Sequence, residues 1–464
     1  MSAAAVANRP IIPAHAQIAV FFLLIIFACL YAALCGNALS YDGSYYFYNL
    51  LDTQKTFAPH GRYTTKVLLW PVLELSRFTD NIRLLLLLFG LIFMAIPAVA
   101  LMASWRVVRD KEPELFVWAA LSSGVAMLPV HIVPTAESVI SIQLFWPILL
   151  GVLTGAHHTL ILVIFSVALF FAHPIALGYF ALAAGVAFLI GRTIRSARMK
   201  VWTLIFAALS VATLVLLALR HDPYEAGELT VAVQLAHFKA SLLGLPMFSL
   251  IFIWLAAALL FLQPIVPAMR RKEHPIQILQ VTGVIVAGVL MAAWARDGAR
   301  CAAALDARDL VAISAFPFMA FAILDRFRWL PRLAVSPPDD RAHRLQLTQI
   351  AGIVFALVLS IQSTVWFNLE VRLHDSLSES KLGCIPTDSI KWLERTPLHN
   401  WTIPTLAVVL QGRKPEKLLL YDNMCSAIGP SNVRLRRGIT FPGPEFTLDR
   451  NEGWFDFSGV RFDH

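Results

Sequence analysis

Charged residues are scarce in this chain: Asp, Glu, Lys and Arg make up 15% of its 464 residues. Hydrophobic residues make up 58%, and the mean hydropathy is +0.67, which excludes an ordinary soluble globular protein. The long apolar runs lack period-two alternation, which argues against a membrane β-barrel. The sequence therefore predicts an all-α polytopic membrane protein with a small C-terminal α/β extracytoplasmic domain.

Two other absences narrow the possible functions. No Gly-Lys-Ser/Thr phosphate-binding motif occurs, which disfavours an ATP-driven pump. No internal repeat or low-complexity tract is present. The net charge of +8 does not indicate a nucleic-acid partner, because the basic residues fall mostly in short loops between apolar runs.

About eleven membrane spans are predicted from the lengths of the apolar runs. They cover residues 17–36, 82–104, 115–130, 139–154, 159–172, 175–191, 201–219, 244–263, 275–294, 310–324 and 345–367. Residues 1–367 then form a transmembrane domain, with a first outer loop at 37–81, and residues 368–464 form a second domain.

The basic residues fall in alternate loops, and this bias predicts the orientation. The cationic loops hold Arg106, Arg109 and Lys111; Arg192, Arg195, Arg198 and Lys200; Arg270, Arg271 and Lys272; and Arg326, Arg328, Arg332, Arg341 and Arg344. These loops, with the N-terminus, are predicted to be cytoplasmic. The first loop and the C-terminal domain are then outside, in the periplasm of a bacterial inner membrane. His157-His158 resembles a ligand pair but falls on the cytoplasmic side.

The tail from residue 368 gains charge, Pro and Gly and has no long apolar run. Thr405–Gln411 and Lys417–Tyr421 are predicted as short strands, and Ser389–Arg395 as a short helix. Cys384 and Cys425 both fall in this tail. An oxidising compartment favours a disulfide between them over two free thiols.

The first outer loop combines an acid, several cations and two amphipathic segments at one membrane surface. Asp42 lies about six residues beyond the first apolar run, and the aromatic run Tyr45–Tyr48 follows it. Ser44–Leu51 and Tyr63–Leu75 are half-apolar and too short to span a bilayer, which needs about 20 residues. The loop also contains the cations His60, Arg62 and Lys66.

Other outer loops bring further ionisable residues to the same predicted face. They are His131 and Glu137 around the second outer connection, His173 before Pro174, and Arg296 and Arg300 between spans nine and ten.

Each candidate could instead have a purely structural role. Asp42 would cap a helix beginning near Ser44, Glu137 would occupy a first helical turn, and His173 would be a hydrogen-bonded turn residue. The two arginines would pair with loop acids, and Tyr45–Tyr48 would form an interfacial belt.

The outer cations have a chemical interpretation, because basic residues there run against the insertion bias. A phosphate at headgroup depth would account for Arg62, Lys66, Arg296 and Arg300, since guanidinium groups bind phosphate through paired hydrogen bonds. A nearby carboxylate can accept a proton from an acceptor hydroxyl. A sugar linked to phosphate is already activated, because cations stabilise the departing anion.

The first span, the Asp in SYDGSYYF after it, and the long first outer loop with two surface helices resemble the GT-C superfamily of membrane glycosyltransferases. This resemblance implies a module of about seven spans extended by variable helices. It implies an inverting transfer from a polyprenyl-phosphate-linked sugar donor to a lipid or glycan acceptor, with membrane lipids around the site. It further implies Asp42 as catalytic base or acceptor-positioning group. Glu137, as the second-loop acid, would help to bind substrate or a divalent metal, Mg or Mn, although no metal ligand set is assigned.

The chain departs from two branches of that superfamily. Gly43 follows Asp42, so the Asp-Glu pair of the mannosyltransferase branch is absent, and the tail has no Trp-Trp-Asp motif of the oligosaccharyltransferases. The sugar and the acceptor stay open. Two other classes also stay open: a transporter or lipid flippase, which would place ionisable groups near the bilayer midplane, and a non-catalytic envelope assembly protein.

Overall fold

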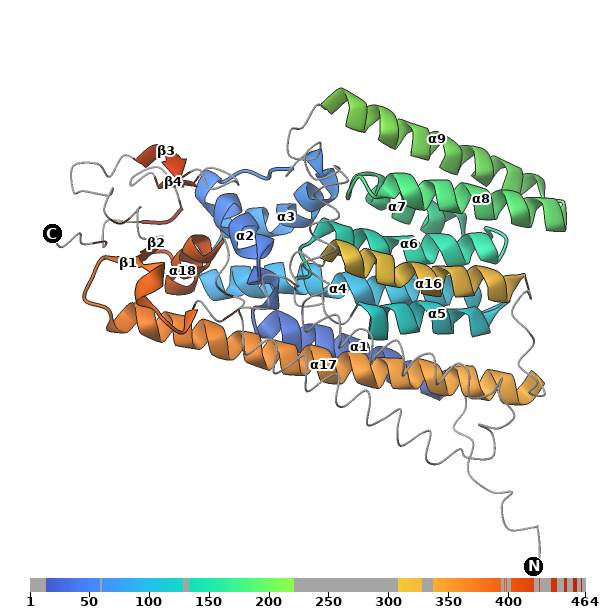
Figure 1. Ribbon diagram of the computed structural model, residues 1–464, viewed down its shortest axis with the longest axis horizontal. Helices are drawn as coiled ribbons and strands as arrows, with labels where there is room; N and C mark the ends of the chain where they lie inside the picture. Colours follow the sequence, from blue (N-terminus) through green and yellow to red (C-terminus); the bar gives the residue numbers. More distant parts are fainter. Residues whose placement is uncertain are drawn as a thin grey trace, which may run out of the picture.

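The computed structural model describes residues 14–58, 61–127, 133–220, 308–327, 337–393 and 402–420, together with shorter stretches of the tail. It is mostly helical, and long helices lie side by side with the tail at one end (Figure 1). The helices of the first domain are α1 (Ala14–Leu34), α2 (Asp42–Thr53), α3 (Tyr63–Ser76), α4 (Ile82–Val108), α5 (Phe116–Leu121), α6 (Glu137–Leu153), α7 (Thr159–Phe170), α8 (Ala176–Ile194), α9 (Ala197–Arg220), α16 (Arg308–Arg326) and α17 (Pro337–Glu379).

Among the described residues, five helices are long and apolar enough to cross a membrane. They are α1, α4, α8, α9 and α17, and the shorter apolar helices α6 and α7 accompany them. This pattern shows a membrane protein with several apolar helices. It does not confirm eleven spans, and the predicted spans 244–263 and 275–294 lie outside the described residues. The two amphipathic segments of the first loop are helices, α2 and α3, as predicted.

Helix α6 forms the centre of the bundle, because every residue from Glu137 to Leu153 is buried. Helices α4, α7, α8 and α16 pack around it. On α1, Phe21, Ile25, Ala28 and Ala32 are buried with the spacing of one helical face. That face packs against α4 and α17. Contacts of Tyr46 and Arg62 with Glu137 place the start of α6 at the same end of the bundle as α2 and the start of α3, and the end of α1 leads into α2 at that end (Figure 1).

The opposite end of the bundle collects cations from separate loops and is called the basic end here. Arg326 pairs with Glu112 at 3.1 Å, and Arg344 pairs with Asp325. Burial and the neighbouring cations Lys111 and Arg198 lower the pKa of His157. The segregation agrees with the charge bias of the sequence, whereas the assignment of this end to the cytoplasm stays a prediction.

After α17, the described residues of the tail form helix α18 and two small two-stranded sheets. Strands β1 (Cys384–Pro386) and β2 (Leu418–Leu420) pair in parallel, with Ile385 opposite Leu419. Helix α18 (Ile403–Gln411) lies between them in sequence and packs on α2. Strands β3 (Leu435–Ile439) and β4 (Phe446–Leu448) form an antiparallel pair. The tail therefore lies directly against the first outer loop (Figure 1).

Two local predictions in the tail are wrong and one is right. The predicted strand Thr405–Gln411 is part of α18, which begins with Pro404 in its first turn and ends before Gly412. Proline at a helix start and glycine after its end are the usual helix boundaries, and they outweigh the β-branched content here. The predicted helix at 389–395 is not seen in its described part: the 3₁₀ turn Thr387–Ser389 ends at the first predicted residue, and 390–393 contain no α-helix, while residues 394 and 395 lie outside the described part. The predicted strand at 417–421 is confirmed as β2.

The predicted disulfide is confirmed: Cys384 and Cys425 are bonded, with their Cα atoms 5.7 Å apart. Cys384 begins β1, so the bond ties Cys425 to the β1–β2 sheet. The two cysteines are 41 positions apart in the chain. Cys29 and Cys35 are buried free thiols, as packing residues of the first helix would be.

We expect replacement of Cys384 and Cys425 by Ser to destabilise the tail by roughly 2–4 kcal/mol, because the bond restricts the unfolded chain. Limited proteolysis of the membrane-embedded protein should then cut after residue 379 faster than in the parent. Reduction of the parent with a thiol should reproduce the effect. Equal cleavage rates in the oxidised, reduced and Ser forms would show that the bond contributes nothing to the fold of the tail.

Candidate active site at the tail end of the bundle

A strained turn presents Asp42. Helix α2 begins at Asp42, and Tyr41 before it has φ 51° and ψ −122°, a left-handed backbone that a residue other than glycine rarely adopts. Strain of this kind persists only where the surrounding structure enforces it, and it concentrates at functional sites. Because Tyr41 occupies the N-cap position and Asp42 is the first helical residue, the interpretation of Asp42 as an N-cap is wrong.

Gly43 makes the turn possible. A Cβ atom at position 43 would overlap the carbonyl oxygen of Ala38, so any side chain there would displace the backbone. This close approach explains why the chain has Asp-Gly where the resemblance would allow Asp-Glu. A glutamate could not follow Asp42 without rebuilding the turn.

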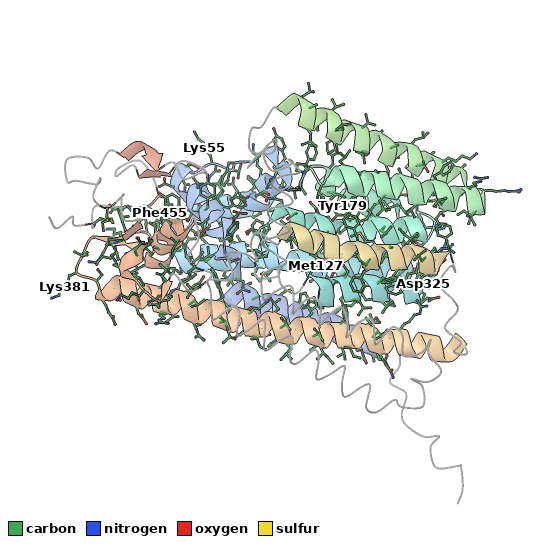
Figure 2. All side chains as sticks on the ribbon, viewed as in Figure 1. Lys55, Met127, Tyr179, Asp325, Lys381 and Phe455 are labelled. Carbon is green, nitrogen blue, oxygen red and sulfur yellow. A yellow bond between two sulfur atoms is a disulfide. The ribbon has the colours of Figure 1, made fainter. Side chains whose placement is uncertain are left out.

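Contacts from two other helices hold the turn in place. Before it, the Asn37 amide donates to Ser363 Oγ of α17 at 3.0 Å. After it, Ser44 Oγ donates to the Thr402 carbonyl at 3.4 Å and lies 3.3 Å from Thr405 Oγ1 of α18. Tyr48, one turn further, stacks on Phe455 of the tail with ring centroids 5.1 Å apart. Phe455 lies at the tail end of the bundle (Figure 2). The tail therefore packs against α2, the helix that begins with Asp42.

Asp42 is half-buried and lies close to two tyrosines of its own helix. Burial, with the negative charge of Asp42, raises the pKa of Tyr45 to about 12. Burial also raises the pKa of Tyr46 well above its ordinary value, and the charges of Glu137 and Asp42 add to this effect. Tyr46 is therefore a protonated donor at neutral pH, and its phenol lies in the field of both carboxylates.

Glu137 is the centre of a buried hydrogen-bonded cluster. Arg62 Nη1 pairs with Glu137 Oε2 at 2.8 Å. The Tyr46 hydroxyl donates to Oε1 at 2.7 Å, and Thr65 Oγ1 donates to the same oxygen at 3.2 Å. The side chains of Glu137 and Arg62 are only 2% and 10% exposed. Glu137 is also the first residue of α6, where the helix dipole favours a negative charge.

This geometry separates the roles open to the two carboxylates. Three donors contact Glu137, and one of them is the Arg62 guanidinium, so Glu137 is suited to holding Arg62 in a fixed orientation. Asp42 is half-buried and more exposed than Glu137, so that a substrate hydroxyl can reach it more readily. Asp42 is therefore the better candidate base, and Glu137 the better candidate positioning residue.

The connection between α7 and α8 lies beside this cluster. The Thr64 backbone N–H donates to the Phe171 carbonyl at 3.1 Å, and Thr64 Oγ1 donates to the Ala168 carbonyl at 2.6 Å, so the start of α3 lies against the end of α7. His173 follows within two residues, and its Nδ1 accepts the backbone N–H of Ile175 at 3.2 Å. That hydrogen bond is the turn role that the sequence offered as the alternative to substrate binding.

The remaining candidates have mixed outcomes. Lys66 is exposed on α3. His60, His131, Arg296 and Arg300 lie outside the described residues. Within the described part of the chain, no group of three or more His, Cys, Asp or Glu side chains could hold a metal ion, and the Mg or Mn expectation stays a prediction. The predicted aromatic belt is wrong for Tyr46, Phe47 and Tyr48, because all three are buried in the protein.

Two residues of the cluster were not predicted from the sequence, although their spacing carried a signal. Tyr46 follows Asp42 by four positions, and Thr65 follows Arg62 by three. Residues at these spacings share one face of a helix. Once α2 and α3 are taken as helices, Tyr46 and Thr65 are expected beside the candidates that precede them.

We expect Tyr46→Phe to lower the free energy of unfolding by roughly 1.5–3 kcal/mol, the range for a hydrogen bond to a charged group. The change removes only the hydroxyl that donates to Glu137. Tyr31→Phe is the matched control, since the Tyr31 hydroxyl contacts the neutral Thr364 hydroxyl at an exposed position. Thermal unfolding in detergent should show a clearly larger loss for Tyr46→Phe, and equal losses would contradict the geometry of the cluster.

Comparison with known proteins identifies no relative: no family model, no curated protein and no solved structure matches this chain. The function has to be argued from the chemistry of the cluster itself.

Proposed function

We propose that this chain is an inverting glycosyltransferase that takes its sugar from a polyprenyl-phosphate donor at the outer face of a bacterial inner membrane. The observation that carries the proposal is the position of Asp42, directly after the strained Tyr41, near the Tyr46 phenol that donates to Glu137 of the buried Arg62–Glu137 ion pair. In this proposal the tail end of the bundle faces the periplasm and the basic end faces the cytoplasm. The acceptor is a lipid or a glycan with a free hydroxyl.

The transfer needs one base and one cation. Asp42 accepts the proton of the acceptor hydroxyl as its oxygen attacks the anomeric carbon of the donor. The bond between that carbon and the phosphate oxygen breaks, and its electron pair leaves with the phosphate. Arg62 stabilises the departing phosphate through the positive charge of its planar guanidinium, which Glu137 holds in place through Nη1. A single displacement of this kind inverts the anomeric configuration, and Asp42 releases the proton to solvent.

The position of the cluster favours this chemistry over transport. Asp42, Arg62 and Glu137 all lie at the first turns or the cap of helices, at one end of the bundle. Transporters place ionisable groups near the bilayer midplane, often at breaks within spans. A site at helix ends is instead at headgroup depth, where the phosphate of a lipid-linked donor lies. Lys66, exposed on α3, can contact membrane lipid headgroups there.

Direct assay of donor consumption tests the proposal. The full chain in lipid nanodiscs is incubated with polyprenyl-phosphate sugars extracted from bacterial membranes, and mass spectrometry follows the lipids. We expect one donor species to lose its sugar and to appear as free polyprenyl phosphate when an acceptor lipid fraction is present. If no donor in the extract binds or is consumed, the transferase proposal fails.

Arg62→Lys separates phosphate binding from folding. Lysine keeps a positive charge opposite Glu137 but lacks the planar fork that binds phosphate through two hydrogen bonds. We expect donor affinity to fall by about tenfold or more, because paired charge-assisted hydrogen bonds are among the stronger polar contacts. Arg77→Lys, on the same helix in an exposed pair with Glu74, is the control and should leave donor affinity unchanged. Unchanged affinity in Arg62→Lys would remove Arg62 from the donor site.

A further inference from the structure

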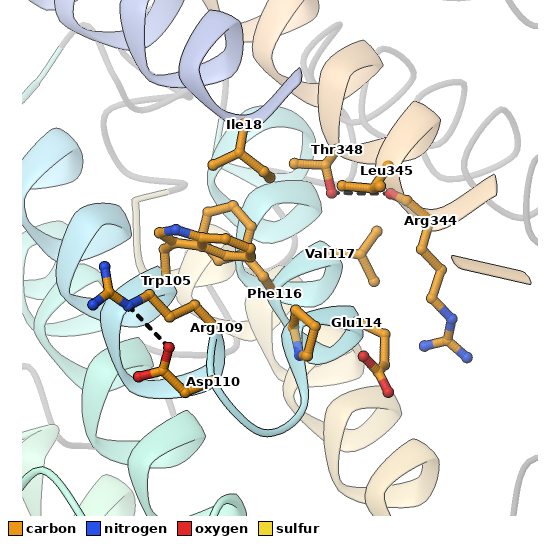
Figure 3. A pocket seen from close by; sticks show the side chains of 11 residues that line it. Ile18, Trp105, Arg109, Asp110, Glu114, Phe116, Val117, Arg344, Leu345 and Thr348 are labelled. Carbon is orange, nitrogen blue, oxygen red and sulfur yellow. Dashed lines mark hydrogen bonds and ion pairs between the residues drawn. The ribbon is translucent and has the colours of Figure 1, made fainter. Parts of the chain in front are cut away.

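A cavity of about 200 Å³ lies at the basic end, opposite to the candidate active site. Its lining comes from α1, from α4 and the turn that follows it, from α5 and from α17 (Figure 3). The cavity is smaller than the pockets that usually hold drug-sized ligands. It offers room for a headgroup rather than for a large solute.

The floor of the cavity is apolar and aromatic. Ile18, Phe116, Val117 and Leu345 line it, and Trp105 packs edge-to-face on Phe116 with ring centroids 5.4 Å apart (Figure 3). Tryptophan combines an apolar ring with an N–H donor and is favoured at membrane–water boundaries. The floor is therefore suited to hydrocarbon that enters from a membrane.

Three candidate spans fix the depth of this cavity. In α1 the segment that could cross a membrane is Ala16–Leu34, and Ile18 is its third residue. In α17 that segment is Arg344–Glu379, and Arg344 is its first residue. Trp105 lies near the end of the apolar segment Ile82–Val108 on α4, and Arg109 directly follows that segment. Each of these three apolar segments therefore begins or ends beside the cavity. It therefore lies at the boundary between hydrocarbon and water, which is headgroup depth.

Charges of both signs surround the cavity in equal number. Arg109 pairs with Asp110 at 3.3 Å, and Arg344 pairs with Asp325. Glu114 also lines the cavity, is exposed, and makes no ion pair with any residue that the structure describes. A purely anionic headgroup would be repelled by the two carboxylates that line the cavity, Asp110 and Glu114. A headgroup with a phosphate and an ammonium group would satisfy both signs.

From this combination we infer that the cavity binds one phospholipid with a primary-amine headgroup, phosphatidylethanolamine in chemical class, in the leaflet opposite to the candidate active site. The ammonium group donates to the Glu114 carboxylate. The phosphate contacts the Arg109 guanidinium, which uses Nε for Asp110. The start of the acyl chains covers the floor formed by Ile18, Phe116 and Leu345. The inference is independent of the transferase proposal.

Native mass spectrometry of the full chain in detergent tests the site with three phospholipids of identical acyl chains. We expect one bound phosphatidylethanolamine, with affinity about tenfold above that of phosphatidylglycerol, because one charge-assisted hydrogen bond supplies a factor of this size. Phosphatidylcholine keeps the positive charge but has no N–H donor, so it should also bind more weakly. Equal affinities for the three lipids in the unmodified protein would overturn the inference.

Substitutions then locate the lipid. Glu114→Gln should reduce the affinity for phosphatidylethanolamine to the level of phosphatidylglycerol, and Arg109→Gln should weaken both. Arg192→Gln is the matched control, since Arg192 is an exposed arginine in the last turn of α8 and does not line the cavity. If Glu114→Gln keeps the preference, or if Arg192→Gln weakens binding as much as Arg109→Gln, the lipid is held elsewhere or by general charge, and the inference fails.

Discussion

Asp42→Asn should lower the rate of sugar transfer by at least about 100-fold, since a positioned general base contributes a factor of roughly 10²–10⁴. The amide has nearly the same shape as the carboxylate but cannot take the proton of the acceptor hydroxyl. The turn should survive, because Gly43 against Ala38 and Ser44 against α18 do not involve the carboxylate. Donor binding should also survive, because Arg62 and Glu137 keep their contacts.

The control for this substitution is Asp80→Asn at the same end of the bundle. Asp80 is an exposed residue that pairs with Arg413 of the tail and is not part of the Glu137 cluster. Transfer rate and donor affinity should be measured for both variants in the same nanodiscs. A transfer rate in Asp42→Asn within twofold of Asp80→Asn would exclude Asp42 as the base. Loss of donor binding in Asp42→Asn would instead assign Asp42 to the binding of substrate.

The fold could be predicted from the sequence wherever a single local pattern dominates. Long apolar runs located α1, α4, α8, α9 and α17, and the amphipathic segments of the first loop located α2 and α3. The pattern failed at Thr405–Gln411, a largely apolar stretch whose length and β-branched content suit a strand. Residues 403–409 are buried and pack in part on α2, and a buried apolar segment can be a strand or a helix. Pro404 at its start and Gly412 after its end favour the helix.

The candidate site could be predicted in its location but not in its connectivity. Charge bias brought Asp42, Arg62 and Glu137 to one face, and the structure places all three at the tail end. Sequence could not show that Arg62 and Glu137 form a buried pair, because two residues 75 positions apart in the chain carry no pairing signal. It also treated Tyr46, Phe47 and Tyr48 as facing lipid. Instead the tail and α3 cover α2, a tertiary contact that no local pattern records.

Glu137→Gln should destabilise the protein by roughly 3–5 kcal/mol, the cost of leaving one charge of a buried ion pair without its partner. Glutamine can still accept the hydrogen bond from Tyr46, so the loss isolates the charge opposite Arg62. The side chains of this pair are 10% and 2% exposed, and water cannot replace the carboxylate at the guanidinium. Thermal or denaturant unfolding in detergent, followed by circular dichroism, measures the change.

The exposed pair Arg77–Glu74 on α3 is the matched control, because it has the same chemistry and nearly the same length, 2.9 Å against 2.8 Å. Its side chains are 54% and 33% exposed, and Glu74→Gln should cost under about 1 kcal/mol. The double variant Arg62→Met with Glu137→Gln removes both charges and should be more stable than Glu137→Gln alone. If Glu137→Gln costs no more than Glu74→Gln, then Arg62 is solvated, the pair is not buried, and Glu137 does not position Arg62 for a phosphate.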